Sequence, residues 1–212
     1  MSARTLTAIT MALSLSFCGL PIHAMPSEAD MAQCAPKVPK DVLKKILRHE
    51  SGGQALAVGL NSDLLQLKKQ PKNQQQAERL IRILDAAGLS YDVGVGQVNS
   101  RNLSRWGVDP VAALDVCHNL ELAQRVYVDC ASRYNSVSEI LSCYNTNDPL
   151  KGVKNGYVSK VLKGGGKVQV DVVKRERPGK PSKSSEPKSN SEREAGWIDD
   201  SEEWMKDDGW LQ

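Results

Sequence analysis

Hydrophobic positions in the first half of the chain follow helical spacing in two segments. Leu43, Ile46 and Leu47 lie at i, i+3 and i+4, and the same spacing recurs at four apolar positions between residues 77 and 84. Further along, capping residues and stop signals mark other segments. The pattern predicts helices over residues 41–51, 74–87, 102–106, 119–134 and 152–162, one opened by the capping box Ser136–Glu139, and a helix start at Asp109-Pro110.

Residues 89–100 interrupt the helical pattern. Valines alternate there with polar residues, and Gly94 and Gly96 allow sharp turns or the close approach of another segment. We interpret this stretch as an extended loop or a short strand. The chain is therefore expected to be mainly helical, with one small extended part.

Glu50 is a charged residue on the apolar face of the first predicted helix. It falls one turn after Leu47 on the face that Leu43 and Ile46 define, and a serine and two glycines follow it. Burial and the negative end of a helix dipole both raise the pKa of a carboxyl group. The carboxyl suits a general acid, but a side chain that caps the helix or bonds the nearby backbone fits the spacing equally well.

The ends of the chain differ from its middle. Residues 1–24 carry an apolar run and end in a small-residue cleavage site after Ala24, which is typical of a secretory signal peptide, and the run is short for a membrane anchor. We expect export to the periplasm. One compact domain is expected over 25–163, followed by a basic, disordered linker over 164–196 and an acidic tail over 197–212.

The acidic tail combines charge with large apolar side chains. It holds six acids against Lys206, while Trp197, Trp204 and Leu211 recur every seven residues. This spacing suits a short amphipathic helix that docks on a partner, although a solvated tail would carry the same charges.

Four cysteines remain after the signal segment is removed, which suggests two disulfides in an exported protein. Cys130 and Cys143 fall on predicted consecutive antiparallel helices, so we pair them, which leaves Cys34 with Cys117. The chain has no Cys-x-x-Cys pair and only three histidines, so neither a zinc site nor another cofactor is expected. The formal net charge of +3 does not favour nucleic acid as a partner.

A single buried glutamate near polar loops suits glycosidic cleavage, in which an acid protonates the leaving oxygen. Hydrolases usually add a second carboxylate, and the candidates here are Asp63 and Asp92. Neither lies in a second strong motif, and Asp92 also fits a residue that bonds its own loop. A lone acid is possible if the substrate supplies its own nucleophile.

Three ordered motifs resemble those of the lysozyme-like lytic transglycosylases. They are His-Glu-Ser-Gly-Gly at 49–53, Gly-Val-Gly-Gln-Val-Asn at 94–99 and Cys-Tyr-Asn at 143–145. The resemblance covers about residues 32–162 and is closest to members that accompany type IV secretion and conjugation systems. Two departures stand out: Gly96 replaces a bulky residue such as methionine, which should alter the loop packing or the cleft wall, and Cys143 replaces alanine.

The resemblance implies a role for each matched residue. Glu50 would be the single acid and base, and Ser51 would orient it or bond an N-acetyl group. Gln97 and Asn99 would bond sugar substituents. Tyr144 would position Glu50 or the glycan, and Asn145 would hold its own loop. Taken singly, these side chains also fit purely structural roles.

The resemblance further implies a mainly α (α+β) lysozyme-like fold with a glycan cleft. The expected activity is peptidoglycan lytic transglycosylation that gives 1,6-anhydro-N-acetylmuramyl products, with secretion components as partners of the tail. Two alternatives stay open: a hydrolytic muramidase that uses Glu50 with Asp92, and an inactive wall-binding scaffold.

Overall fold

The computed structural model describes residues 25–62 and 65–163. The predicted signal peptide, Asp63, the linker and the acidic tail lie outside these ranges. Within them the chain forms eight α-helices, one 3-10 helix and three short strands. The elements are α1 (Glu28–Cys34), α2 (Lys40–Glu50), β1 (Val58–Leu60), α3 (Gln74–Ala86), β2 (Tyr91–Val93), β3 (Val98–Asn99), α4 (Ser100–Trp106), η1 (Ala112–Leu114), α5 (Val116–Arg133), α6 (Val137–Thr146), α7 (Lys151–Lys154) and α8 (Tyr157–Lys163). The expected mainly helical fold with a small extended part is confirmed.

Helix starts follow the capping signals in the sequence. Asn73 Oδ1 accepts a hydrogen bond from the Gln76 amide at 2.9 Å, which opens α3. Ser136 and Glu139 form the predicted capping box of α6. At its other end, α4 stops where Gly107 adopts a left-handed conformation with φ of 67°.

Two helix predictions were wrong in part, and one helix was not predicted. The predicted helix over 152–162 is two helices, because Gly156 turns the chain between α7 and α8 with φ of 83°. The start at Asp109-Pro110 leads only to turns and η1, and α5 begins later, where Asp115 caps the His118 amide at 2.8 Å. Helix α1 was not predicted, although Ser27 and Asp30 form a capping box that marks it.

The three strands form one antiparallel sheet in the order β1-β2-β3. Gly59 pairs with Asp92, and Asp92 pairs with Asn99, so these three residues form one row across the sheet. Strands β2 and β3 occupy the stretch interpreted as extended. Strand β1 lies in a segment where only a loop was expected.

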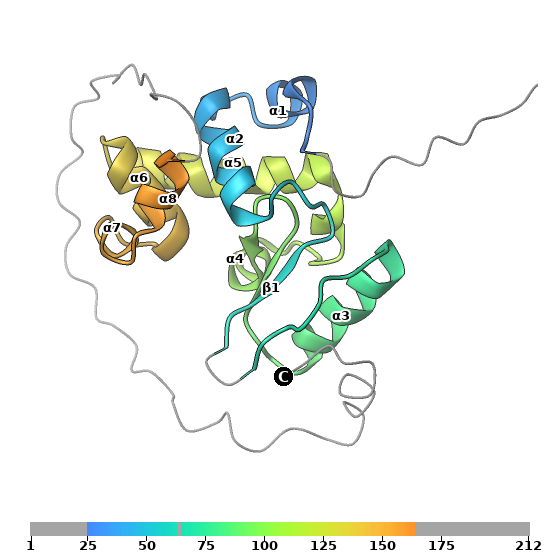
Figure 1. Cartoon of the computed structure of the whole chain (residues 1–212). Helices are drawn as coiled ribbons and strands as arrows, with labels where there is room; N and C mark the ends of the chain where they lie inside the picture. Colours follow the sequence, from blue (N-terminus) through green and yellow to red (C-terminus); the bar gives the residue numbers. More distant parts are fainter. Residues whose placement is uncertain (1–24, 63–64, 164–212) are drawn as a thin grey trace, which may run out of the picture.

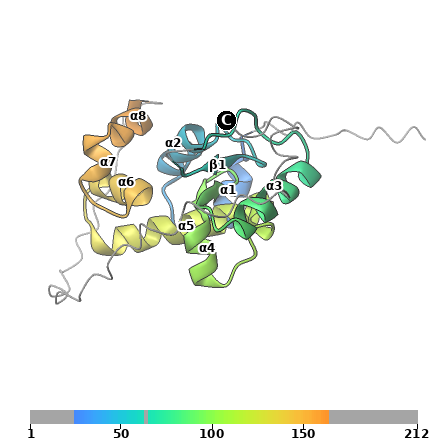
Figure 2. The same cartoon turned by 90° about the horizontal axis from the view of Figure 1, so that it is seen from below.

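Helix α5 connects two hydrophobic cores. Leu120, Tyr127 and Cys130 belong to a core shared with α1, α2, α6 and α8, whereas Leu122 and Ala123 belong to a core shared with the sheet, α3 and α4. Figures 1 and 2 show α6, α7 and α8 gathered at one end of α5 and α3 toward the other. Tyr144 packs against both cores, so the two lobes meet beside this side chain.

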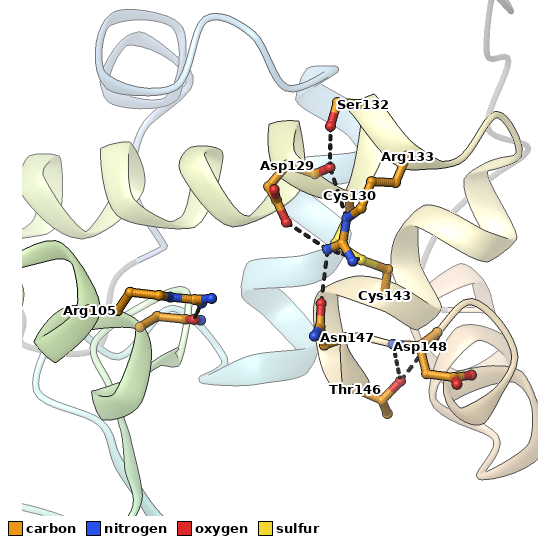
Figure 3. Close-up of polar contacts among 10 residues, drawn as sticks. Arg105, Asp129, Cys130, Ser132, Arg133, Cys143, Thr146, Asn147 and Asp148 are labelled. Atoms are coloured by element: carbon orange, nitrogen blue, oxygen red, sulfur yellow. Dashed lines mark hydrogen bonds and ion pairs between the residues drawn. A yellow bond between two sulfur atoms is a disulfide. The ribbon is translucent and has the colours of Figure 1, made fainter. Parts of the chain in front are cut away.

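Both predicted disulfides are present. Cys34–Cys117 joins α1 to the start of α5, and Cys130–Cys143 joins α5 to α6. Beside the second bond, the Arg133 guanidinium donates to Asp129 Oδ2 at 2.6 Å and to Asn147 Oδ1 at 2.9 Å (Figure 3). Arg133 therefore ties the end of α5 to the left-handed residue that ends α6.

None of the helices within 25–62 and 65–163 combines the length and the apolar character needed to cross a membrane.

The two disulfides should differ in their contribution to stability. They close sequence separations of 83 and 13 residues, and cross-linking a longer loop removes more entropy from the unfolded chain. We expect the Cys34→Ala/Cys117→Ala pair to lower the free energy of unfolding by about 4.5 kcal/mol and the Cys130→Ala/Cys143→Ala pair by about 3 kcal/mol. Urea unfolding of both variants beside the wild type measures this, and a reversed order would contradict it.

Candidate active site

A cleft of about 320 Å³ opens where the two lobes meet. Its walls are mainly carboxyl, amide and hydroxyl side chains from both lobes. The lining residues are Glu50, Asn61, Ser90, Asp92, Gln97, Val98, Asn99, Arg101, Asn102, Val126, Tyr144 and Asn145. Of the predicted catalytic and substrate-binding residues, Ser51 does not line it, whereas Glu50, Gln97, Asn99, Tyr144 and Asn145 do.

Glu50 is the last residue of α2 and follows the phase predicted for it. Leu43, Ile46 and Leu47 on the same face are buried in the first core, and this packing carries the Glu50 carboxyl into the cleft. Burial raises its pKa from 4.5 to about 7, and the charge of Asp92 acts in the same direction. The carboxyl is therefore substantially protonated at neutral pH and can both donate and accept a proton.

Tyr157 holds the Glu50 carboxyl in place. Its hydroxyl donates a hydrogen bond to Glu50 Oε1, which opposes the effect of burial on the pKa of Glu50. Tyr157 opens α8 directly after Gly156, and its ring meets that of His49 edge-on, with centroids 4.9 Å apart. Tyr157 was not among the residues predicted from the sequence. The turn at Asn155-Gly156, which positions Tyr157 at the start of α8, lies within the single helix that was predicted over 152–162.

Ser51 and Tyr144 secure the backbone of the Gly94–Gln97 turn. Ser51 Oγ donates to the Val95 carbonyl at 2.8 Å, and the Tyr144 hydroxyl donates to the Gly96 carbonyl at 2.8 Å. Ser51 is thus directed at the protein and not at the cleft. Tyr144 lines the cleft, and burial raises the pKa of its hydroxyl well above the ordinary value, so it stays neutral.

Asn119 of α5 also holds the backbone of this turn through side-chain hydrogen bonds. It is fully buried, and its Oδ1 accepts from the Gly96 amide at 2.8 Å while its Nδ2 donates to the carbonyls of Val93 and Ala113. A Cβ on Gly96 would lie 2.7 Å from that of Ala123, so α5 occupies the space that a side chain at position 96 would need. Asn119 was also missed, since a lone asparagine in a helix carries no distinguishing signal.

The sheet contributes a row of linked polar groups. Asp92 Oδ1 accepts from Asn99 Nδ2 at 2.8 Å, and Asp92 Oδ2 accepts from Asn61 Nδ2 at 2.9 Å. Burial raises the pKa of Asp92, and these two bonds act against the increase. Asn99 also caps α4 by accepting from the Arg101 amide at 3.0 Å. Asp92 therefore bonds its own lobe, and it also faces the cleft that holds Glu50.

Gln97 and Asn145 also line the cleft. Gln97 has a left-handed φ of 48°, and its Nε2 donates to the Gly94 carbonyl at 2.9 Å and to the Ala57 carbonyl at 3.2 Å. Asn145 Oδ1 accepts from Asn155 Nδ2 at 3.2 Å, and this bond joins the end of α6 to the residue before the turn into α8.

The structure adds Tyr157, Asn61, Ser90, Arg101, Asn102 and Val126 to the site. Asp63, the other candidate second carboxylate, lies outside the described residues. In the described ranges, histidine, cysteine and carboxylate side chains do not gather in groups of three that could hold a metal ion.

Comparisons with known proteins identify relatives of the chain. It is similar to "Protein virB1" of Rhizobium radiobacter, with 32% identity over 165 residues, 73% of this chain and 68% of that protein. "Protein virB1" of Agrobacterium fabrum (strain C58) is 37% identical over 139 residues, 61% of this chain and 55% of that protein. "Type IV secretion system protein virB1" of Brucella abortus biovar 1 is 29% identical over 144 residues, 61% of this chain and 60% of that protein.

No solved structure matches the chain significantly. The family model described as "Transglycosylase SLT domain" matches residues 27–158, which include Glu50, the Gly94–Gln97 turn, Tyr144 and Tyr157. The chain belongs to the transglycosylase SLT domain family.

Proposed function

We propose that the chain is a periplasmic lytic transglycosylase that cleaves the bond between N-acetylmuramic acid and N-acetylglucosamine in peptidoglycan. The observation that carries this proposal is the Glu50 carboxyl, which lies in a polar cleft with a pKa of about 7 and a hydrogen bond from Tyr157. One group with such a pKa can serve as acid and then as base near neutral pH.

The proposed reaction proceeds in two proton transfers. Protonated Glu50 gives its proton to the glycosidic oxygen as the bond from that oxygen to the muramyl anomeric carbon breaks. The 2-acetamido group of the muramyl residue steadies the positive charge on that carbon. Glu50, now a carboxylate, takes the proton of the muramyl 6-hydroxyl, and the freed oxygen attacks the anomeric carbon. The products are a 1,6-anhydro ring and a free glucosaminyl end, and no water is consumed.

Other residues support this chemistry indirectly. Tyr157 stabilises the carboxylate between the two transfers, because its hydroxyl donates to the charged form. Asn119, Ser51 and Tyr144 hold the turn that presents Gln97 to the glycan. A rigid wall of this kind lowers the entropic cost of aligning the sugar with the acid.

A hydrolytic muramidase is the second candidate, because Asp92 lines the same cleft as Glu50 and its charge raises the pKa of Glu50. In that mechanism Asp92 would be the second carboxylate, used on the anomeric carbon or on a water molecule. The two amides that bond Asp92 leave it less free for this role.

Glu50→Gln should abolish cleavage, with a fall of at least about 10³-fold in rate, because one substitution removes both the acid and the base. The fold should persist, since glutamine has nearly the same shape. Mass spectrometry of muropeptides released from purified sacculi by wild type and variant measures both activity and product. We expect wild-type products that carry anhydromuramyl ends, each one water lighter than its hydrolytic counterpart.

Three outcomes would contradict this scheme. Products with only reducing muramyl ends would establish hydrolysis and favour Asp92 as the partner of Glu50. Wild-type protein that binds sacculi and releases nothing would favour the wall-binding scaffold. Equal activity in Glu50→Gln would reject Glu50 as the acid.

Tyr157→Phe should shift the pH profile. Loss of the hydroxyl removes a donor to the Glu50 carboxylate, so the pKa of Glu50 should rise from about 7. The wild-type rate should fall as pH increases through 7, and in the variant this fall should move upward by about one pH unit. Initial rates between pH 5 and 9 measure the shift. Tyr127→Phe, a buried tyrosine of the first core that does not line the cleft, is the control and should leave the profile in place.

We further propose that the enzyme opens the wall for a type IV secretion apparatus, because the Brucella relative is named "Type IV secretion system protein virB1". The acidic tail over 197–212 would recruit components of that apparatus through Trp197 and Trp204. Removing residues 174–212 should leave cleavage of soluble glycan within about twofold of wild type, because the shortened chain still contains all of residues 27–158, which match the family model. Pull-downs from envelope extracts should lose secretion components, and unchanged capture would reject this role of the tail.

A further inference from the structure

Among the described residues that line the cleft, Arg101 is the only basic one. It lies in the first turn of α4, directly after the sheet strand that carries Asn99. Its backbone amide is held by Asn99 Oδ1 at 3.0 Å, and Asn99 is held in turn by Asp92. The base of this side chain is therefore fixed to the sheet.

The guanidinium of Arg101 is not engaged by other described residues of the protein. Within 25–62 and 65–163 it makes no hydrogen bond or ion pair, and the side chain is exposed. Asp92, the carboxyl of the sheet row, accepts its side-chain hydrogen bonds from two asparagine amides and not from Arg101. The cation is thus not present to neutralise a cleft carboxylate of the protein, and it is available to a ligand.

An arginine guanidinium binds carboxylates in a planar, two-point geometry. In a glycan of alternating sugars, the glucosaminyl residue is neutral, whereas the muramyl residue carries a lactyl ether group that ends in a carboxylate or in a peptide with carboxylates. The anionic group thus occurs on every second sugar. A cation fixed in the cleft can distinguish the two sugars, whereas amides that contact shared N-acetyl and hydroxyl groups cannot do so.

We propose that Arg101 binds a carboxylate of the lactyl substituent on a muramyl residue, and that this contact sets the register of the strand against Glu50. The inference rests on the proposed function and adds a specificity determinant to it. A slip by one sugar would place the wrong glycosidic bond beside Glu50 and would leave Arg101 facing a neutral residue.

The test compares three soluble strands of the same length. One kind carries stem peptides, one is denuded and has free lactyl carboxylates, and one is denuded with its carboxylates converted to neutral methylamides. Arg101→Gln should raise KM for the anionic strands by about 10- to 100-fold with little change in kcat. On the neutral strands, wild type and Arg101→Gln should have the same KM. Arg101→Lys should be intermediate, because it keeps the charge and loses the two-point geometry.

Arg82→Gln is the matched control, since Arg82 is exposed on α3, does not line the cleft and changes net charge equally. It should behave as wild type on all three strands. A large effect of Arg101→Gln on peptide-bearing strands alone assigns the carboxylate to the peptide, and an effect on denuded strands assigns it to the lactyl group. An equal loss on charged and neutral strands, or no loss on either charged strand, would overturn the proposal.

Binding separates this proposal from the proposed function. Calorimetric titration of the three strands into Glu50→Gln and Glu50→Gln/Arg101→Gln requires no turnover. The wild type could release no anhydro product while the double variant binds anionic strands at least about tenfold more weakly than Glu50→Gln does. In that case the proposed reaction is rejected and the Arg101 contact is supported. If both variants bind anionic strands equally, the contact is rejected whatever the activity.

Discussion

The site depends on keeping one carboxyl group largely out of water. Burial is the main cause of the raised pKa of Glu50, and the rest of the local structure maintains that burial. Helix α2 delivers the residue because three leucine and isoleucine side chains on the same face pack in the first core. At the start of α8, Tyr157 packs in the same core and its hydroxyl donates a hydrogen bond to the carboxyl. A less buried Glu50 would ionise below neutral pH and would lack the proton that the proposed reaction requires.

The opposite wall is built on backbone hydrogen bonds. Three side chains hydrogen-bond main-chain groups of residues 93–96: Ser51 just after α2, Asn119 in α5 and Tyr144 in α6. The turn has little side-chain bulk of its own, because glycines at 94 and 96 leave room for Asn119 and Ala123. Its geometry is therefore imposed by its neighbours, and these neighbours come from both lobes.

Sequence patterns predicted the parts of this arrangement that have a local cause. The phase of Glu50 follows from the spacing of Leu43, Ile46 and Leu47, and the starts of α3 and α6 follow from Asn73 and Ser136. The pairing of Cys130 with Cys143 followed from adjacent helices.

Non-local features could not be predicted in this way. Tyr157 reaches Glu50 from 107 residues further along the chain, and Asn119 bonds a turn 23 residues earlier. Ser51 shows the limit most clearly: its motif implied a contact with Glu50 or sugar, but tertiary packing directs its hydroxyl to the Val95 carbonyl. Local spacing says which face a residue occupies, and only the packed fold determines its partner.

The buried carboxyl also makes the folded state pH-dependent. The pKa of Glu50 is about 7 in the fold and near 4.5 when the side chain is free. Below 4.5 the group is protonated in both states and imposes no penalty. Between about pH 4.5 and 7 the carboxyl binds more protons in the folded state than in the unfolded state, so the free energy of unfolding falls as pH rises across this range, by about 3 kcal/mol in all. The residue that we propose as the acid and base is therefore one that selection for stability alone would replace with a neutral side chain. If the proposed role is right, its presence reflects a conflict between stability and activity at a single position.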